Sequence, residues 1–125
     1  MKRLSETYDV YTKGTCMHEF VISMEKLHKE KGVTATDIAK AMLDEGMHPP
    51  TMYFPLIVHE ALMFEPTETE GKAGLDDVVE AMERIYRMAE ENPEKMHELP
   101  LKTVIRRPDE VKAAREPVVR YNFEK

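Results

Sequence analysis

Histidine, a common metal ligand, occurs five times in this sequence. A helical zinc site needs two histidines four residues apart, so that both imidazoles face one ion. No pair of histidines has this spacing, and Cys16 is the only cysteine that could complete a site. We therefore expect no metal site. We expect isolated surface or interface histidines at five positions, His18, His28, His48, His59 and His97.

A glycine-flanked segment, Gly71-Lys72-Ala73-Gly74, precedes a predicted helix and could bind a phosphate through backbone N–H groups. The side chains around it argue against this interpretation. From Glu65 to Glu83 there are seven acidic residues and one basic residue, and these carboxylates would repel an anion. An ordinary helix start with a solvated acidic face is the better interpretation.

Lysine can form a Schiff base with a carbonyl cofactor when a desolvated pocket lowers its pKa and a phosphate site lies beside it. Lys29 follows a histidine in the string Leu27-His28-Lys29-Glu30. It belongs to residues 25–31, a stretch so rich in charge that water should surround it. We therefore do not expect Lys29 to be catalytic.

The composition is that of one soluble domain. Of the 125 residues, 34% are charged and 42% are hydrophobic, which is typical of globular proteins. The net charge of −6 argues against general nucleic-acid binding. No apolar run is long enough to span a membrane, and no apolar signal segment follows the first residues. A single cysteine allows no internal disulfide, so we expect a cytoplasmic protein.

The first half of the chain contains one predicted strand and one predicted helix. Residues 1–15 show no period, and we expect an irregular lead-in there. β-Branched and aromatic residues from Met17 to Ser23 predict a strand. Thr34 as N-cap, with Asp37 three residues later, predicts a helix that Gly46 ends.

Two more strands and a long helix follow. Prolines end the predicted strands at residues 52–54 and 61–65, which we expect to pair antiparallel. Apolar residues at helical spacing predict a helix over residues 74–91, with Asp76 and Asp77 in its first turn. Short helical turns are predicted from Pro93 and over residues 108–114. This order predicts an α+β fold, a small antiparallel sheet with helices packed on one face.

Several long strings of the sequence carry a resemblance to a known family. The strings are Met-His-Glu-Phe-Val at 17–21, Gly-Met-His-Pro-Pro-Thr at 46–51, Tyr-Phe-Pro-Leu-Ile-Val at 53–58, Glu-Ala-Leu-Met-Phe-Glu-Pro-Thr-Glu-Thr-Glu at 60–70, and Arg-Arg-Pro-Asp-Glu-Val-Lys-Ala-Ala-Arg at 106–115. They occur in the same order as in the C-terminal domain of glycine decarboxylases, which use pyridoxal phosphate, and the chain resembles this family from about residue 17 to residue 120. The two adjacent prolines and the Phe-Pro-Leu-Ile-Val string are more similar to subunit 2 of the two-subunit form than to the single-chain form.

The resemblance implies that residues 16–125 form a domain like the C-terminal small domain of fold-type I pyridoxal-phosphate enzymes. It implies a part in glycine decarboxylation with aminomethyl transfer to the lipoyl carrier (H) protein. The implied partners are subunit 1 and the large domain of subunit 2. The cofactor lysine of the family lies in an Asn-x-His-Lys-Thr string of that large domain, which nothing here matches. We therefore expect this chain alone to bind no pyridoxal phosphate and to be inactive. The alternative is a free-standing, non-catalytic interaction or dimerisation domain derived from that enzyme.

Small domains of this enzyme class close over the active site, so the resemblance favours a cleft-facing role for the loop that begins at His48. The alternative is an ordinary turn between a helix and a strand. The cleft-facing candidates are His48, Thr51, Glu65 and Thr67. We also expect self-association through apolar surface, with contributions from Met47, Met52 and Tyr53, since ten methionines exceed the need of a small core.

Overall fold

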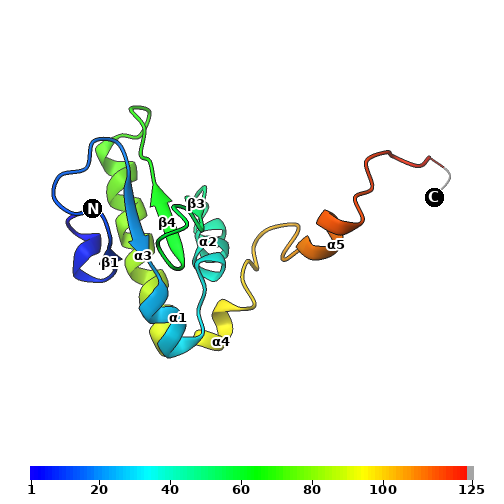
Figure 1. Ribbon diagram of the computed structural model, residues 1–125, viewed down its shortest axis with the longest axis horizontal. Coiled ribbons are helices and arrows are strands. Elements are labelled where there is room, and N and C mark those ends of the chain that lie inside the picture. The colour runs from blue at the N-terminus through cyan, green and yellow to red at the C-terminus, as the bar shows by residue number, and fades with distance from the viewer. Residues whose placement is uncertain (124–125) are drawn as a thin grey trace.

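The computed structural model describes residues 1–123, and within them a four-stranded sheet forms the centre of the fold (Figure 1). The spatial order of the strands is β1-β2-β4-β3, and every neighbouring pair is antiparallel. The predicted pairing of the two strands around residues 52 and 61–65 is confirmed. The strands are β1 (Asp9–Val10), β2 (Phe20–Ser23), β3 (Thr51–Met52) and β4 (Ala61–Phe64).

Helices pack on one face of this sheet, as predicted. Alternate residues of β2 and β4 point to this face, where Phe20 and Phe64 stack with ring centroids 5.3 Å apart. The helices that bury this face are α1 (Glu25–Lys31), α2 (Ala35–Asp44) and α3 (Lys72–Glu91). The opposite face carries a smaller apolar group, Val21, Ala61 and Met63, over which Val58 folds. The expected α+β fold is confirmed.

Helix α2 has the caps that the sequence predicted. The Thr34 hydroxyl accepts a hydrogen bond from the backbone N–H of Asp37, and the Asp37 carboxylate accepts one from the backbone N–H of Thr34. At the other end, Gly46 has φ +77°, and the N–H of Met47 donates to the carbonyl of Met42. This is a glycine-dependent helix end, because a side chain at Gly46 would be strained.

The expectation that residues 1–15 are an irregular lead-in is wrong. They contain a short 3-10 helix, η1 (Leu4–Glu6), and strand β1. Leu4 and Tyr8 are buried in the main core, and the Tyr8 hydroxyl donates to the carbonyl of Met82 at 2.7 Å. Burial raises the pKa of Tyr8 far above its usual value. These elements are too short to show a period, so tertiary contacts alone order them.

Two helices differ from the sequence expectation. Residues 25–31 were expected only to be solvated, but they form α1, which buries Leu27. Helix α3 begins at Lys72 and not at residue 74, so the prediction that Asp76 and Asp77 lie in its first turn is wrong. Asp76 instead pairs with Lys72 one turn earlier and with Arg3 from the N-terminal segment.

A buried carboxylate connects α2 to the C-terminal segment. Asp37, only 2% exposed, accepts a hydrogen bond from Arg107 Nη2 at 2.7 Å, and His97 Nδ1 lies 3.2 Å from its other oxygen. Burial raises the pKa of the Asp37 carboxyl, but hydrogen bonds from Thr34 and Arg107 outweigh burial and hold the pKa below its usual value. We call Thr34, Asp37, His97 and Arg107 the Asp37 cluster.

The chain after α3 contains the two short helices that the sequence predicted, α4 (Pro93–Met96) and α5 (Glu110–Arg115). Helix α4 packs against α2 and α3, whereas α5 stands away from the rest of the molecule (Figure 1). Within residues 1–123, no helix is both long enough and apolar enough to cross a membrane. The expected domain limit at residue 125 lies outside the described residues.

Candidate functional site

A pocket of about 470 Å³ opens at the end of the sheet where β4 finishes. Its floor is apolar and comes from the N-terminal segment, the sheet, α2 and α3: Met1, Leu4, Phe20, Met42, Met63, Phe64, Leu75, Val78 and Val79. Its rim contains all four residues that the sequence singled out, His48, Thr51, Glu65 and Thr67. The fold thus brings together side chains from two separate loops.

The first rim loop, residues 48–51, starts directly after the helix end at Gly46. Because Gly46 turns the chain back and Met47 packs on the core, the loop leaves α2 in a fixed direction. Pro49 and Pro50 have fixed φ angles, which lowers the entropy that this loop loses on folding. Thr51 then begins β3, opposite Met63 of β4. His48 and Thr51 are exposed, so both side chains are accessible at the rim.

The second rim loop, residues 65–70, joins β4 to α3. The Thr67 hydroxyl lies 2.7 Å from the Thr69 hydroxyl, and the N–H of Glu70 donates to the Thr67 carbonyl, which closes a turn. Glu70 also lines the pocket, although the sequence reading did not select it. With Glu65, it gives this side of the rim two carboxylates.

The pocket can bind an apolar group on its floor while rim side chains hydrogen-bond to a polar end. The rim offers an imidazole, two hydroxyl groups and two carboxylates as hydrogen-bonding groups. The described lining residues include no lysine, the residue whose side-chain amine forms a Schiff base with a carbonyl cofactor. Lys29 lies elsewhere, on α1, where its exposed ammonium group contacts Glu25 at 2.5 Å. The apolar floor is open to solvent at its rim. Open apolar surface of this kind is typical of a contact site for another domain or subunit.

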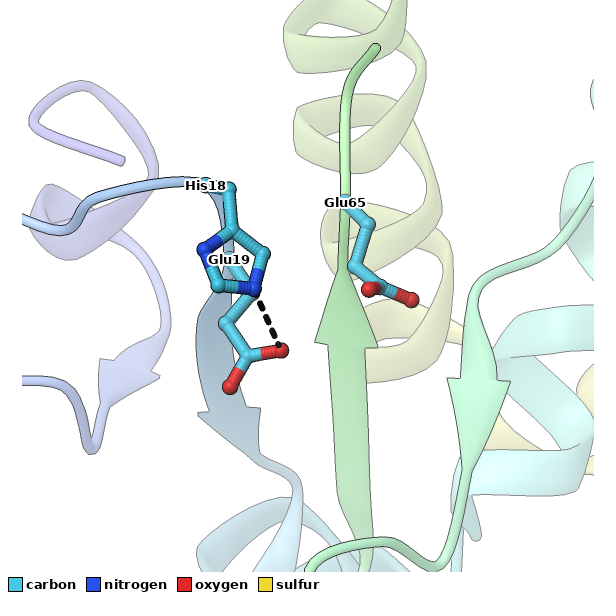
Figure 2. A group of neighbouring side chains, drawn as sticks. All are labelled: His18, Glu19 and Glu65. Carbon is cyan, nitrogen blue, oxygen red and sulfur yellow. Dashed lines mark ion pairs between the residues drawn. The ribbon is translucent and has the colours of Figure 1, made fainter.

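A second group of polar side chains lies where β2 and β4 come together beyond their paired residues (Figure 2). His18 Nε2 is 3.6 Å from Glu19 Oε2, and Glu65 lies just beyond the end of the neighbouring strand β4. One ligand atom from each of the three residues lies within 4.8 Å of the others. Histidine spacing in the sequence could not find this group, because the pairing of β2 with β4 brings Glu65 close to His18 and Glu19. His18 and Glu65 are exposed, and Glu19 is partly buried, so water can solvate all three, and the group alone does not indicate a metal.

Comparison with known proteins identifies the chain's relatives. Residues 1–107 match the model of a family described as glycine dehydrogenase, C-terminal domain. A probable glycine dehydrogenase (decarboxylating) subunit 2 from Treponema denticola is 59% identical over 120 residues, which are 96% of this chain and 25% of that protein. The protein of the same name from Thermosipho melanesiensis is 54% identical over 98% of this chain and 26% of its own length. The protein of the same name from Listeria monocytogenes is 51% identical over 99% of this chain and 25% of its own length. This chain therefore spans about a quarter of the length of these curated relatives.

Proposed function

This chain belongs to the family of glycine dehydrogenase C-terminal domains, and we propose that it serves as that domain in subunit 2 of a decarboxylating glycine dehydrogenase. The reaction of the whole enzyme is the decarboxylation of glycine in the glycine cleavage system, with pyridoxal phosphate as cofactor and a lipoyl carrier protein as acceptor. The chain's relatives are named as subunits, which supports a partner subunit. The single cysteine suits a cytoplasmic location.

The residues of the pocket do not by themselves fit pyridoxal phosphate. A bound cofactor needs an amine for its aldehyde and donors for its phosphate. The lining residues contain no lysine, and Glu65 and Glu70 would repel a phosphate. We therefore propose that the cofactor is held by the part of subunit 2 that this chain does not span.

The proposed contribution of this domain is the rim of the cleft. The observation that carries this proposal is that His48, Thr51, Glu65 and Thr67 all line one pocket, although they come from two loops. The imidazole of His48 can orient the carboxylate of glycine by a hydrogen bond or act in a proton transfer. The hydroxyl groups of Thr51 and Thr67 can orient the polar end of a bound molecule by hydrogen bonds.

Replacing His48 by Ala in the whole subunit 2 tests this role. We expect glycine decarboxylation, measured with subunit 1 and the lipoyl carrier protein, to fall tenfold or more, equivalent to about 1.4 kcal/mol. The melting temperature should change little, because His48 is exposed and contributes little to the core. His28→Ala is the matched control, since His28 is an exposed histidine on α1 outside the pocket lining.

Activity unchanged in His48→Ala, or lost only in proportion to stability, would contradict the cleft-facing role. His48 would then be an ordinary turn residue. If the whole subunit 2 carrying this domain also shows no decarboxylation, the alternative of a non-catalytic interaction domain becomes the better explanation.

A further inference from the structure

The C-terminal segment is exposed along its whole described length. Every residue from 104 to 123 is exposed, and we call this segment the arm. The arm extends away from the sheet and its helices (Figure 1). Seven of its exposed residues are large and apolar: Val104, Ile105, Val111, Val118, Val119, Tyr121 and Phe123. Val118, Val119 and Phe123 are each at least 85% exposed. Exposure of these apolar side chains to water is unfavourable, and burial against a partner surface would remove that cost.

The start of the arm is fixed to the body of the domain. Arg107 Nε donates to the carbonyl of Leu99 at 2.6 Å, and its Nη2 donates to Asp37 and to the carbonyl of Met96. Just before the arm, the Asp44 carboxylate accepts hydrogen bonds from the backbone N–H groups of residues 101 and 102. These contacts set the direction in which the arm leaves the domain. Ordering of the arm on a partner therefore costs less entropy than ordering of a free tail.

Helix α5 is the regular element of the arm. The Asp109 side chain caps α5 by accepting a hydrogen bond from the N–H of Lys112 at 2.9 Å. Near the end of the arm, the rings of Tyr121 and Phe123 meet edge to face, with centroids 4.8 Å apart. Each of these aromatic side chains can bury about 150–250 Å² on a partner.

The charge of the arm specifies the chemistry of its partner. The arm holds five of the eighteen basic side chains of the protein but only three of the twenty-four acidic ones. A net positive, apolar segment is complementary to an apolar protein surface flanked by carboxylates. The length of the relatives indicates where that surface lies. Three quarters of each relative falls outside the stretch that this chain matches.

We propose that the arm, residues 104–123, docks on the part of glycine dehydrogenase subunit 2 that this chain does not span. The inference rests on the proposed function. The arm lies on an acidic, apolar surface of that part, with Tyr121 and Phe123 as the main anchors, while the Asp37 cluster holds the opposite end of the arm. The arm thus ties the domain to the rest of the subunit.

Hydrogen–deuterium exchange tests the proposal. One sample is this 125-residue chain, and the other is Treponema denticola subunit 2 with its matching quarter replaced by this chain. In the isolated chain, amides of residues 116–123 should exchange close to the rate of an unstructured peptide. In the chimera they should exchange at least a hundredfold more slowly. Amides of β2 and β4 should be protected in both samples, which confirms that the domain is folded.

Two variants of the chimera identify the anchors. Tyr121→Ser with Phe123→Ser should speed exchange of residues 116–123 at least tenfold and leave β2 and β4 unchanged. Leu56→Ser is the matched control, because it also removes an exposed apolar side chain but lies in the β3–β4 loop. It should leave exchange in the arm unaltered.

Each of three outcomes would overturn the arm proposal. Arm amides that exchange equally fast in both samples would show that the arm docks nowhere on subunit 2. Protection that appears only after subunit 1 is added would assign the arm to that subunit. Protection in the isolated chain that rises with its concentration would assign the arm to a second copy.

Decarboxylation by the same chimera separates the arm proposal from the proposed function. An active chimera with an unprotected arm contradicts only the arm proposal. An inactive chimera with a protected arm contradicts only the proposed function.

Discussion

Replacement of Asp37 by Ala should be the most damaging single change in the Asp37 cluster. The Asp37 carboxylate is 2% exposed and is contacted by three side chains, those of Thr34, His97 and Arg107. Ala removes the reciprocal half of the capping box and the partner of the Arg107 guanidinium. The variant therefore weakens both the start of α2 and the attachment of the C-terminal segment.

The size of the loss follows from these contacts. Breaking a buried ion pair costs about 3–5 kcal/mol, and loss of a cap costs about 0.5–2 kcal/mol. The lower part of the first range applies, because the Arg107 side chain is 33% exposed and keeps its bonds to two backbone carbonyls. The two losses also share one carboxylate. We expect Asp37→Ala to lower the free energy of unfolding by about 3 kcal/mol and the melting temperature by about 10 °C.

Urea unfolding followed by circular dichroism, repeated from pH 3 to pH 8, measures this loss. The folded-state pKa of Asp37 is lowered, so its ionised form contributes stability that is fully present above the unfolded pKa of about 3.9. That stability is lost as the pH falls through the lower, folded-state pKa. The difference between wild type and Asp37→Ala should therefore be constant above about pH 5 and shrink below about pH 4.

The Glu45–Arg84 pair supplies the control. It has the same 2.7 Å separation as Asp37–Arg107, but its side chains are 25% and 48% exposed. Glu45→Gln should change the free energy of unfolding by less than about 0.5 kcal/mol. If Asp37→Ala is no more destabilising than Glu45→Gln, or if its effect does not change with pH, the Asp37 cluster is not a stabilising element.

Three further predictions concern the helix end, the cofactor and the exposed surface. Gly46→Ala should lower the free energy of unfolding by about 1 kcal/mol or more, because a residue with a side chain is strained at φ +77°. Thermal unfolding measures this loss, and an unchanged melting temperature would count against backbone strain at this position. The isolated chain should form no stoichiometric Schiff base with pyridoxal phosphate, as followed by visible absorbance and borohydride trapping; a single labelled lysine, above all Lys29, would refute this. The chain should self-associate at high concentration through exposed apolar residues such as Met52 and Tyr53, 38% and 42% exposed, and light scattering that shows a monomer at all concentrations would exclude this.

The parts of the fold that the sequence predicted well are those with local causes. The start of α2 depends on two side chains three residues apart, and its end depends on one glycine, so short-range rules suffice. Strands that end at prolines are equally local. By contrast, η1 and β1 are ordered by contacts such as the Tyr8–Met82 bond, whose partners lie 74 residues apart. No local sequence pattern predicts such contacts.

The candidate site was predictable only in part. The family resemblance selected His48, Thr51, Glu65 and Thr67, and the fold places all four on one pocket, although their role stays a prediction. The floor of the pocket was not predicted, since Met1 and Leu4 belong to the segment expected to be irregular. The group of His18, Glu19 and Glu65 was also missed, because only strand pairing brings it together.

The strand order β1-β2-β4-β3 determines how this domain must fold. Its two central strands, β2 and β4, are separated in sequence by roughly forty residues that include α1, α2 and β3. Closing so long a loop costs chain entropy before any sheet contact compensates for it. Helix α2 has both of its ends specified locally and can form within microseconds. The sheet forms only when β2 and β4, which are far apart in the sequence, come into contact. We therefore expect the meeting of β2 with β4 to limit how fast the sheet forms.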